Sequence, residues 1–328
     1  MPESHDPHDR MIGIGGQLTL TEPDILPDSS EFVVGGDAAT EGITEKAIPQ
    51  WRLAARKFRR HKVAFISLIV FTIIVLAVLF AGVIAPYGET EQHLDDAFQS
   101  PNSTYWLGTD SLGRDVFSRI LYGGRVSIAV GIAVALITGV LGTLVGLVAG
   151  FYGRAIDTVL MRLTDTMLAF PALVFLIMAS RILGDGIWDV VVAISLIAWM
   201  ALARIVRGQV LALKEQEFVE AARSMGASNF RIMGRHLLPN LVGPITVTVS
   251  LTVAAAILLE TTLSFLGLGV SPVHAATWGN LLAGSEGFIQ TASWLVIWPS
   301  LAIVVTVLCI NFIGDGLRDA LDPTQGKT

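Results

Sequence analysis

Charged residues are scarce in this sequence of 328 residues, where Asp, Glu, Lys and Arg together make up only 15%. A soluble globular chain usually carries about a quarter. Hydrophobic residues instead reach 52%, and the mean hydropathy is +0.64. This balance excludes an ordinary soluble domain and favours an integral membrane protein.

Cysteine and the common catalytic motifs are almost absent. The single cysteine, Cys309, lies in an apolar run, which excludes a disulfide within the chain and a cysteine-based metal cluster. The six histidines form no HExxH motif, and no GxSxG motif occurs. Gly326-Lys327-Thr328 resembles the end of a Walker A loop, but Leu321 stands where its first glycine is required. We therefore predict a protein that is not an enzyme, without a metal, a bound cofactor or an ATPase site of its own.

Long apolar runs dominate what the sequence does contain. A helix needs about 20 apolar residues to cross the hydrocarbon layer of a bilayer. Six runs reach or approach this length, at residues 63–85, 127–151, 159–182, 190–203, 242–268 and 294–313. The fourth run is the shortest and needs turns from both flanks. We therefore expect an all-α integral membrane protein with six transmembrane helices.

Basic residues are unevenly placed around these runs and predict their orientation. Six lie within 51–62, directly before the first run, and six more lie within 204–235, between the fourth and fifth runs. The loop at 269–293, between the fifth and sixth runs, has none. We therefore expect a multi-pass protein of the cell membrane, with both termini and the loop 204–240 in the cytosol.

The first fifty residues differ from the rest of the chain. They hold ten acidic residues against Arg10 and Lys46, without an apolar helical period, so we expect a disordered, acidic cytosolic tail over 1–46. No basic segment followed by a short apolar one opens the sequence, so we expect no cleavable signal peptide. The basic segment 47–62 predicts an amphipathic helix on an anionic membrane surface. Nucleic-acid binding is the alternative, and the adjoining span disfavours it.

The remaining boundaries follow from the apolar runs. We assign 63–126 to the first transmembrane helix and an extracytoplasmic loop, and 127–313 to the transmembrane core that contains the loop 204–240. Residues 314–328 are predicted to be a cytosolic tail. Pro171 lies inside the third run and is expected to kink it.

The segment 217–240 predicts two short helices joined by a sharp turn. Gly226 follows the first periodic stretch, where glycine takes the left-handed conformation without strain, and Ser228 can cap the second helix. The apolar faces are predicted to consist of Phe218, Ala221, Ala222 and Met225 in the first helix and Phe230, Met233 and Leu237 in the second. Such a unit at a membrane surface suits insertion into a groove of a soluble partner.

This segment resembles the EAA loop in the membrane subunits of binding-protein-dependent ABC importers. The matching residues are Glu220, Ala221, Ala222, Gly226, Leu238 and Pro239. His236 departs from the family pattern, which usually has isoleucine there. Other segments resemble the dipeptide, oligopeptide and nickel permeases of that family, in particular the C-type subunits. They lie at 106–110, 113–115, 118–119, 123–125, 161–165, 170–171, 203–209, 260–269 and 314–319.

The resemblance implies a permease subunit that forms the membrane pathway for di- or oligopeptides. It implies a cytosolic coupling helix that docks on an ATPase between spans four and five, with Glu217 beside the residues of the EAA loop. It also implies a homologous permease subunit, two cytosolic ATPase subunits that bind ATP and Mg, and an extracytoplasmic solute-binding protein. The alternatives are nickel or another small solute, a secondary carrier without an ATPase, or a membrane assembly or sensor protein.

Three further features have both a structural and a functional interpretation. Glu260 lies within a span, where an ionisable residue either lines a pathway or bonds a neighbouring helix. Glycines at 142, 146 and 150 form a face of small residues that lets another helix approach closely. The pairs Arg154–Asp157 and Arg162–Asp165 have the spacing of ion pairs within one helix, and we expect them to be structural.

Overall fold

The computed structural model describes residues 50–321, so the predicted acidic tail and residues 322–328 lie outside the described part of the chain. The described residues form helices and loops without a β-strand, apart from an isolated bridge between Thr109 and Asp115. The α-helices are α1 (Gln50–Arg60), α2 (Lys62–Leu79), α3 (Ala81–Ile84), α4 (Val116–Tyr152), α5 (Arg154–Leu168), α6 (Ala172–Leu183), α7 (Ile187–Leu213), α8 (Glu217–Ser224), α9 (Asn229–Arg231), α10 (Leu238–Phe265), α11 (Trp278–Ala283) and α12 (Trp294–Leu321).

Two short 3₁₀ turns and one π-helical segment complete the helical elements within 50–321. The turns are η1 (Leu94–Asp96) and η3 (Glu286–Phe288), and the π segment η2 (Ile232–Leu237) joins α9 to α10. The predicted all-α fold is confirmed for this part of the chain.

Five helices of the described chain are long and apolar enough to cross a membrane, namely α2, α4, α7, α10 together with α9 and η2, and α12. The predicted third span, 159–182, is not one straight helix, because α5 and α6 meet at an angle of 91°. The break lies at Pro171, which has no N–H to donate and lies directly before α6. The predicted kink is therefore confirmed. The bend is so large that residues 50–321 hold six spans only if α5 and α6 together count as one.

Some helices extend beyond the apolar runs from which they were predicted. Helix α4 begins at Val116, inside the predicted outer loop, where the Asp115 carboxylate accepts a hydrogen bond from Ser118 N–H at 2.8 Å. The early turns of α4 carry charged residues. One of them, Arg125, donates hydrogen bonds from its guanidinium to the carbonyls of Val78 and Leu79. At the other end of the chain α12 continues to Leu321, so the first half of the predicted tail is helical.

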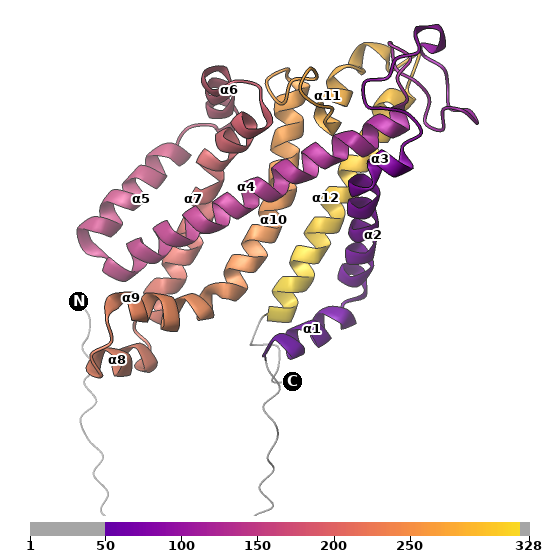
Figure 1. Cartoon of the computed structure of the whole chain (residues 1–328). Coiled ribbons are helices and arrows are strands. Elements are labelled where there is room, and N and C mark those ends of the chain that lie inside the picture. The colour runs from indigo at the N-terminus through magenta and orange to yellow at the C-terminus, as the bar shows by residue number, and fades with distance from the viewer. Residues whose placement is uncertain (1–49, 322–328) are drawn as a thin grey trace, which may run out of the picture. The chain divides into compact units, whose positions relative to one another are not determined.

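Helix α4 is the central element of the helical bundle. It crosses α7 and α10 obliquely (Figure 1), and its most extensive contact is with α7. A Cβ at Gly146 would lie 2.5 Å from the Ala203 carbonyl, and Cβ atoms at Gly142 and Gly150 would lie 2.8 Å from side-chain atoms of α7. The predicted close approach of a helix to this face is confirmed, and the partner is α7.

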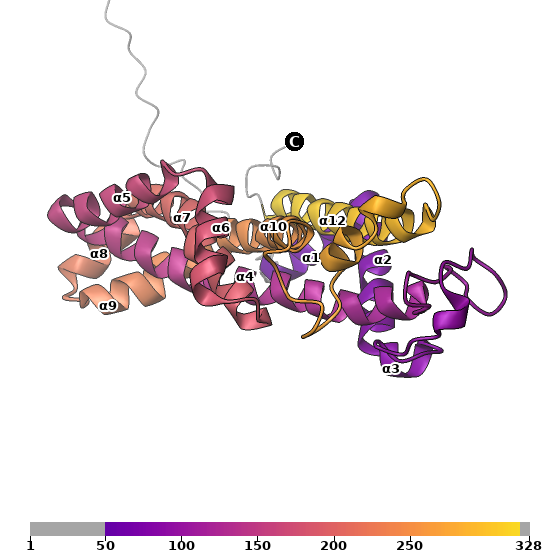
Figure 2. The same ribbon diagram turned by 90° about the horizontal axis from the view of Figure 1, so that it is seen from above.

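The two ends of the helices carry different structures. Helices α8, α9 and α1 lie at one end, which we name the α8 end. Helices α3 and α11 and the loop between α3 and α4 lie at the opposite end, the α11 end (Figure 1). Seen from above (Figure 2), α7, α10 and α12 lie in a row, with α4 along one side of it.

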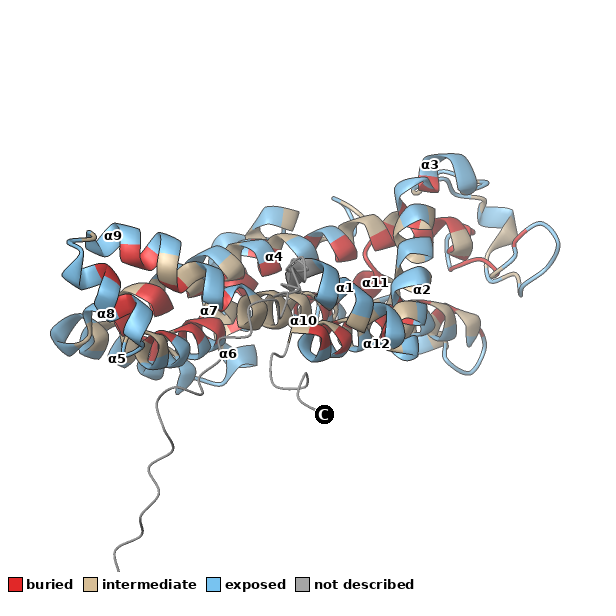
Figure 3. Ribbon diagram, turned by 90° about the horizontal axis from the view of Figure 1, so that it is seen from below, coloured by how far each residue is buried: buried red, intermediate tan, exposed pale blue. Residues whose placement is uncertain are grey.

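Buried residues follow the contact faces of the helices, whereas their outer faces are exposed (Figure 3). Large apolar side chains such as Val159, Ile182 and Leu136 are among the exposed ones. An apolar exterior on long apolar helices is what a bilayer or another membrane helix covers. The fold thus places loops and short helices at two ends and an apolar belt between them.

Candidate functional site

The predicted helical hairpin is present at the α8 end. Helix α8 is followed by Gly226 with a φ of +79°, and Ala227 N–H donates to the Ala222 carbonyl at 3.0 Å, which closes the helix end. The Ser228 hydroxyl accepts a hydrogen bond from Arg231 N–H and caps α9. The predictions for the turn and for the cap are confirmed.

The predicted apolar face of α8 is only partly right. Ala222 is buried, but the structure buries Val219 with it, and Phe218, Ala221 and Met225 are exposed. Both sides of this short helix carry apolar residues, and periodicity alone does not say which side meets the bundle. Val219 was missed because it stands one position from the predicted stripe, where it packs with the buried Ala222.

The second half of the hairpin shows the same division. Met233 and Leu237 are buried as predicted, together with Ile232, whereas Phe230 is 82% exposed. Phe218, Met225 and Phe230 are therefore three large apolar side chains that their own chain leaves uncovered at one end of the molecule. We name them the α8 apolar residues. Apolar groups gathered at an exposed end are typical of a surface that binds another protein.

Acidic residues accompany these apolar side chains. Glu217 and Glu220 lie in the first turn of α8, where negative charge interacts favourably with the helix dipole, and both are exposed. Leu238 and Pro239 open α10 directly after the π segment. Pro239 has no N–H to donate to the turn before it. The residues that resemble the EAA loop thus lie together at one end of the fold.

The hairpin continues into α10 through a π-helical segment rather than an ordinary helical turn. This segment, Ile232–Leu237, contains His236, the residue that departs from the family pattern. The backbone carbonyl of His236 accepts a hydrogen bond from the Asn240 side-chain amide at 2.7 Å. π-Helical segments are rare and frequent at functional sites.

Polar contacts fasten this end of the bundle to the base of the hairpin. Lys214 Nζ donates to the Gly150 carbonyl at 3.3 Å, and the Arg223 guanidinium lies 5.8 Å from the centre of the Phe151 ring. Both contacts join the hairpin side of the molecule to the end of α4. The contact of Arg223 joins α8 itself to the end of α4, and that of Lys214 joins the end of α7 to it.

The aspartates of α5 form ion pairs with arginines of α7. The sequence had suggested pairs with Arg154 and Arg162 of their own helix. Asp157 forms a two-point ion pair with Arg207, with distances of 2.5 and 2.6 Å. Asp165 pairs with Arg204 at 2.5 Å. Both pairs are structural, because they hold α5 against α7. Their arginines belong to the segment 203–209, which lies alongside α5 in the fold.

Glu260 is fully buried within the chain, with an exposure of 0%. Its carboxylate accepts hydrogen bonds from the Ser264 hydroxyl at 2.7 Å and from the Ser127 hydroxyl at 3.1 Å. Ser127 in turn accepts a hydrogen bond from Trp278 N–H at 3.2 Å. The carboxylate therefore links α10, α4 and the start of α11, and this geometry favours the interhelical interpretation. None of its partners belongs to the α8 hairpin.

The loop between α3 and α4 is ordered by its own polar groups at the α11 end. Asp110 accepts hydrogen bonds from Arg114 Nε at 2.7 Å and from Arg119 Nη1 at 2.6 Å. Burial and a hydrogen bond to Asp96 raise the pKa of Tyr105 above its ordinary value. The acidic and basic residues of this loop thus pair with one another, with Asp110 at the centre.

Three or more potential metal ligands do not gather anywhere in the described residues. The arrangement that is present consists of a bundle with an apolar belt, a hairpin with exposed apolar and acidic residues at one end, and a polar loop with a small cavity at the other. The exposed hairpin can contact the surface of a soluble protein, and the cavity at the opposite end can hold a small polar group.

Comparison with known families gives two matches that cover most of the chain. Residues 142–327 match the model of the binding-protein-dependent transport system inner membrane component. Residues 49–101 match the N-terminal TM domain of oligopeptide transport permease C. The first match includes the α8 hairpin and Glu260, and the second includes α1, α2 and α3.

Individual relatives align over nearly their full length. The oligopeptide transport system permease protein OppC of Bacillus subtilis is 39% identical over 89% of this chain and 95% of its own length. The dipeptide transport system permease protein DppC of Alkalihalophilus pseudofirmus is 40% identical over 84% and 91%. The glutathione transport system permease protein GsiD of Pectobacterium atrosepticum is 43% identical over 83% and 91%.

Among solved structures, an inward-facing form of the MetNI methionine ABC transporter matches with a TM-score of 0.47 and 19% identity. It covers 60% of this chain and 94% of its own. The family assignment rests on the sequence matches, which extend from the first helix to the C-terminal end. On this evidence the chain belongs to the family of inner membrane components of binding-protein-dependent transport systems.

Proposed function

We propose that this chain is the C-type permease subunit of an ATP-driven importer for di- or oligopeptides. The observation that carries the proposal is the near full-length similarity to permease proteins named for oligopeptide and dipeptide transport. In this proposal the chain binds no cofactor and hydrolyses no ATP. ATP and Mg act on two partner ATPase subunits, and a second, homologous permease completes the pathway.

The α8 hairpin is the proposed contact with an ATPase subunit. Its α8 apolar residues would enter a groove of the partner, and Glu217 and Glu220 would make polar contacts at the rim. The contacts of Lys214 and Arg223 with the end of α4 support a transmission of motion, because α4 packs against both α7 and α10. Closure of the ATPase pair would then move the hairpins, and the bundles would alternate between inward and outward access.

The α8 end is proposed to be cytosolic and the α11 end extracytoplasmic. The basic residues of α1 and of the hairpin support this orientation. A solute-binding protein would deliver peptides at the α11 end. Single cysteines at Ser103 and Thr104 should react with an impermeant thiol reagent in intact cells when Cys309 is replaced by serine, whereas one at Ser228 should not.

Co-purification and uptake test the function together. The chain is expressed with its permease and ATPase partners and its binding protein in cells that lack peptide uptake. We expect the ATPase to co-purify and the cells to accumulate a labelled dipeptide. Uptake by the lone chain without an ATPase would show a secondary carrier instead, and uptake of nickel but not of peptides would overturn the peptide assignment.

A further inference from the structure

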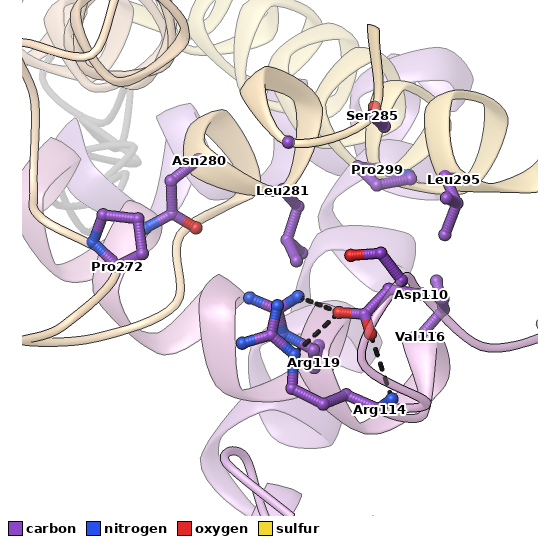
Figure 4. A pocket seen from close by; sticks show the side chains of 12 residues that line it. Asp110, Arg114, Val116, Arg119, Pro272, Asn280, Leu281, Ser285, Leu295 and Pro299 are labelled. Atoms are coloured by element: carbon purple, nitrogen blue, oxygen red, sulfur yellow. Dashed lines mark hydrogen bonds and ion pairs between the residues drawn. The ribbon is translucent and has the colours of Figure 1, made fainter. Parts of the chain in front are cut away.

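A cavity of about 150 Å³ lies at the α11 end, between the start of α4, α11 and the start of α12 (Figure 4). One water molecule needs roughly 10–15 Å³ of such space, so the cavity has room for a group of several atoms. Neither the family resemblance nor the proposed coupling mechanism assigns a role to it. Its charged lining residues are Asp110, Arg114 and Arg119.

The cavity lining has one more positive charge than negative, because two arginines, Arg114 and Arg119, share the carboxylate of Asp110. Both carboxylate oxygens of Asp110 are fully used. One accepts from the backbone N–H groups of Leu112 and Arg114 at 2.9 and 3.0 Å, and the other accepts from the side chains of Arg114 and Arg119. A nearby carboxylate, Glu89, is bonded to the backbone N–H of Ala276 and does not line the cavity.

Arg119 retains an unused donor that is buried. The residue is 7% exposed, and its Nη1 donates to Asp110. Its Nε has no hydrogen-bond partner and is closed off from solvent. Its guanidinium points into the cavity toward Asn280 and Leu281 (Figure 4). A guanidinium that faces a cavity can form a charge-assisted hydrogen bond with a carboxylate. The cavity therefore offers a place for an added anionic oxygen beside the Arg119 guanidinium.

The rest of the lining combines five apolar residues with Asn280, Gly284 and two serines, Ser111 and Ser285. Val116, Leu281 and Leu295 face the cavity together with Pro272 and Pro299. The Asn280 amide is already bonded to the carbonyls of Val270 and Ala275, so it adds no free donor. A ligand that suits this cavity carries a carboxylate at one side and an apolar group at the other.

We propose that this cavity binds the C-terminal residue of a peptide, with its carboxylate on Arg119 and its apolar side chain against Val116, Leu281 and Leu295. The inference rests on the proposed import of peptides and on the extracytoplasmic position of the α11 end. It gives the importer a contact with its solute on the permease itself, at the end where the binding protein releases it.

Binding to the assembled complex tests this site. The complex of the chain with its permease and ATPase partners is placed in lipid nanodiscs without the binding protein and titrated with Ala-Leu by calorimetry. We expect Ala-Leu to bind, and its C-terminal amide to bind at least about tenfold more weakly, because a charge-assisted hydrogen bond is lost. Sodium acetate, which has no apolar side chain, should also bind more weakly than Ala-Leu.

Two variants assign the binding to the cavity. Arg119→Gln should reduce the affinity for Ala-Leu about tenfold or more, and Leu281→Trp should do so by filling the cavity without a change of charge. Arg181→Gln, which changes an exposed arginine of α6, is the matched control and should bind normally. Thermal unfolding of each complex shows whether it is folded, and Leu281→Trp decides the result if Arg119→Gln is not.

The outcomes separate this inference from the proposed function. Equal affinities for Ala-Leu and its amide, unchanged binding by Leu281→Trp, or no binding by the unaltered complex would each overturn the site, even when cells take up peptides. Acetate that binds as tightly as Ala-Leu would show an anion site only. Loss of ATPase association and of peptide uptake in the unaltered importer would instead overturn the proposed function.

Discussion

The two ends of this molecule differ in how completely their side chains are buried and hydrogen-bonded within the chain. At the α11 end, Asn280, Thr277 and Asp110 are buried and hydrogen-bonded, and α11 packs against α4 and α10. At the α8 end, short helices leave Phe230 and Met225 almost bare. The comparison shows that one end buries its polar groups in internal contacts, whereas the other leaves large apolar side chains exposed.

The same difference appears in the glycines. Gly113 and Gly226 both have a positive φ, but a Cβ at Gly113 would overlap the backbone carbonyl of His93, whereas a Cβ at Gly226 would meet nothing within 4 Å. Substitution of Gly113 should therefore damage the fold, and substitution of Gly226 should damage mainly an assembly. The predictions that follow test this contrast.

The largest effect is expected for Gly113→Val. The unfavourable φ alone costs about 1–2 kcal/mol, and the overlap with His93 must in addition displace the loop backbone. We expect little folded protein in the membrane, as measured by fluorescence-detected size-exclusion chromatography. Gly287→Val is the control, because its φ is not positive and its surroundings are open. Normal yields of the Gly113 variant would contradict the dense packing of the α11 end.

Glu260→Ala should have the next largest effect on stability. It leaves the buried hydroxyls of Ser127 and Ser264 without their acceptor, and each lost partner costs about 1–3 kcal/mol. Glu260→Gln keeps an acceptor and should recover most of the stability, as measured by thermal unfolding in nanodiscs. A glutamine variant that is stable but transports poorly would instead support a position of Glu260 on the pathway.

Gly226→Val and Phe230→Ser should change assembly more than stability. The strain at Gly226 is about 1–2 kcal/mol and is local, and Phe230 makes little contact with its own chain. We expect a several-fold loss of ATPase in a pull-down, with a thermal unfolding temperature close to that of the parent. Val219→Ser, on the buried side of α8, is the contrasting variant and should lower stability. Full ATPase binding by the first two variants would refute the coupling assignment.

The smallest effect is expected at the ion pairs between α5 and α7. Asp165→Asn breaks a half-exposed pair and should cost no more than about 1 kcal/mol. Asp157→Asn breaks a two-point pair that is less exposed and should cost more. The free energy of unfolding of the two variants, measured with and without added salt, checks this order. Equal effects would show that burial does not distinguish the pairs.

Much of the site could be read from the sequence because it depends on local chemistry. Gly226 and Ser228 sit where a left-handed turn and a helix cap require them, and the structure has both. Side chains that pack were harder to assign. Phe218 and Val219 are neighbours of similar hydrophobicity, and only contact with the bundle buries the second and leaves the first exposed.

The sequence by itself determined the membrane class, the apolar runs, the helical hairpin and the bend at Pro171. These depend on composition and on short-range backbone preferences. The tertiary structure alone decided which groups meet over long separations. It paired Asp157 with Arg207, placed Ser127 and Trp278 beside Glu260, and enclosed Arg119 in a cavity. Such contacts depend on how distant helices cross, and no spacing along the chain records that.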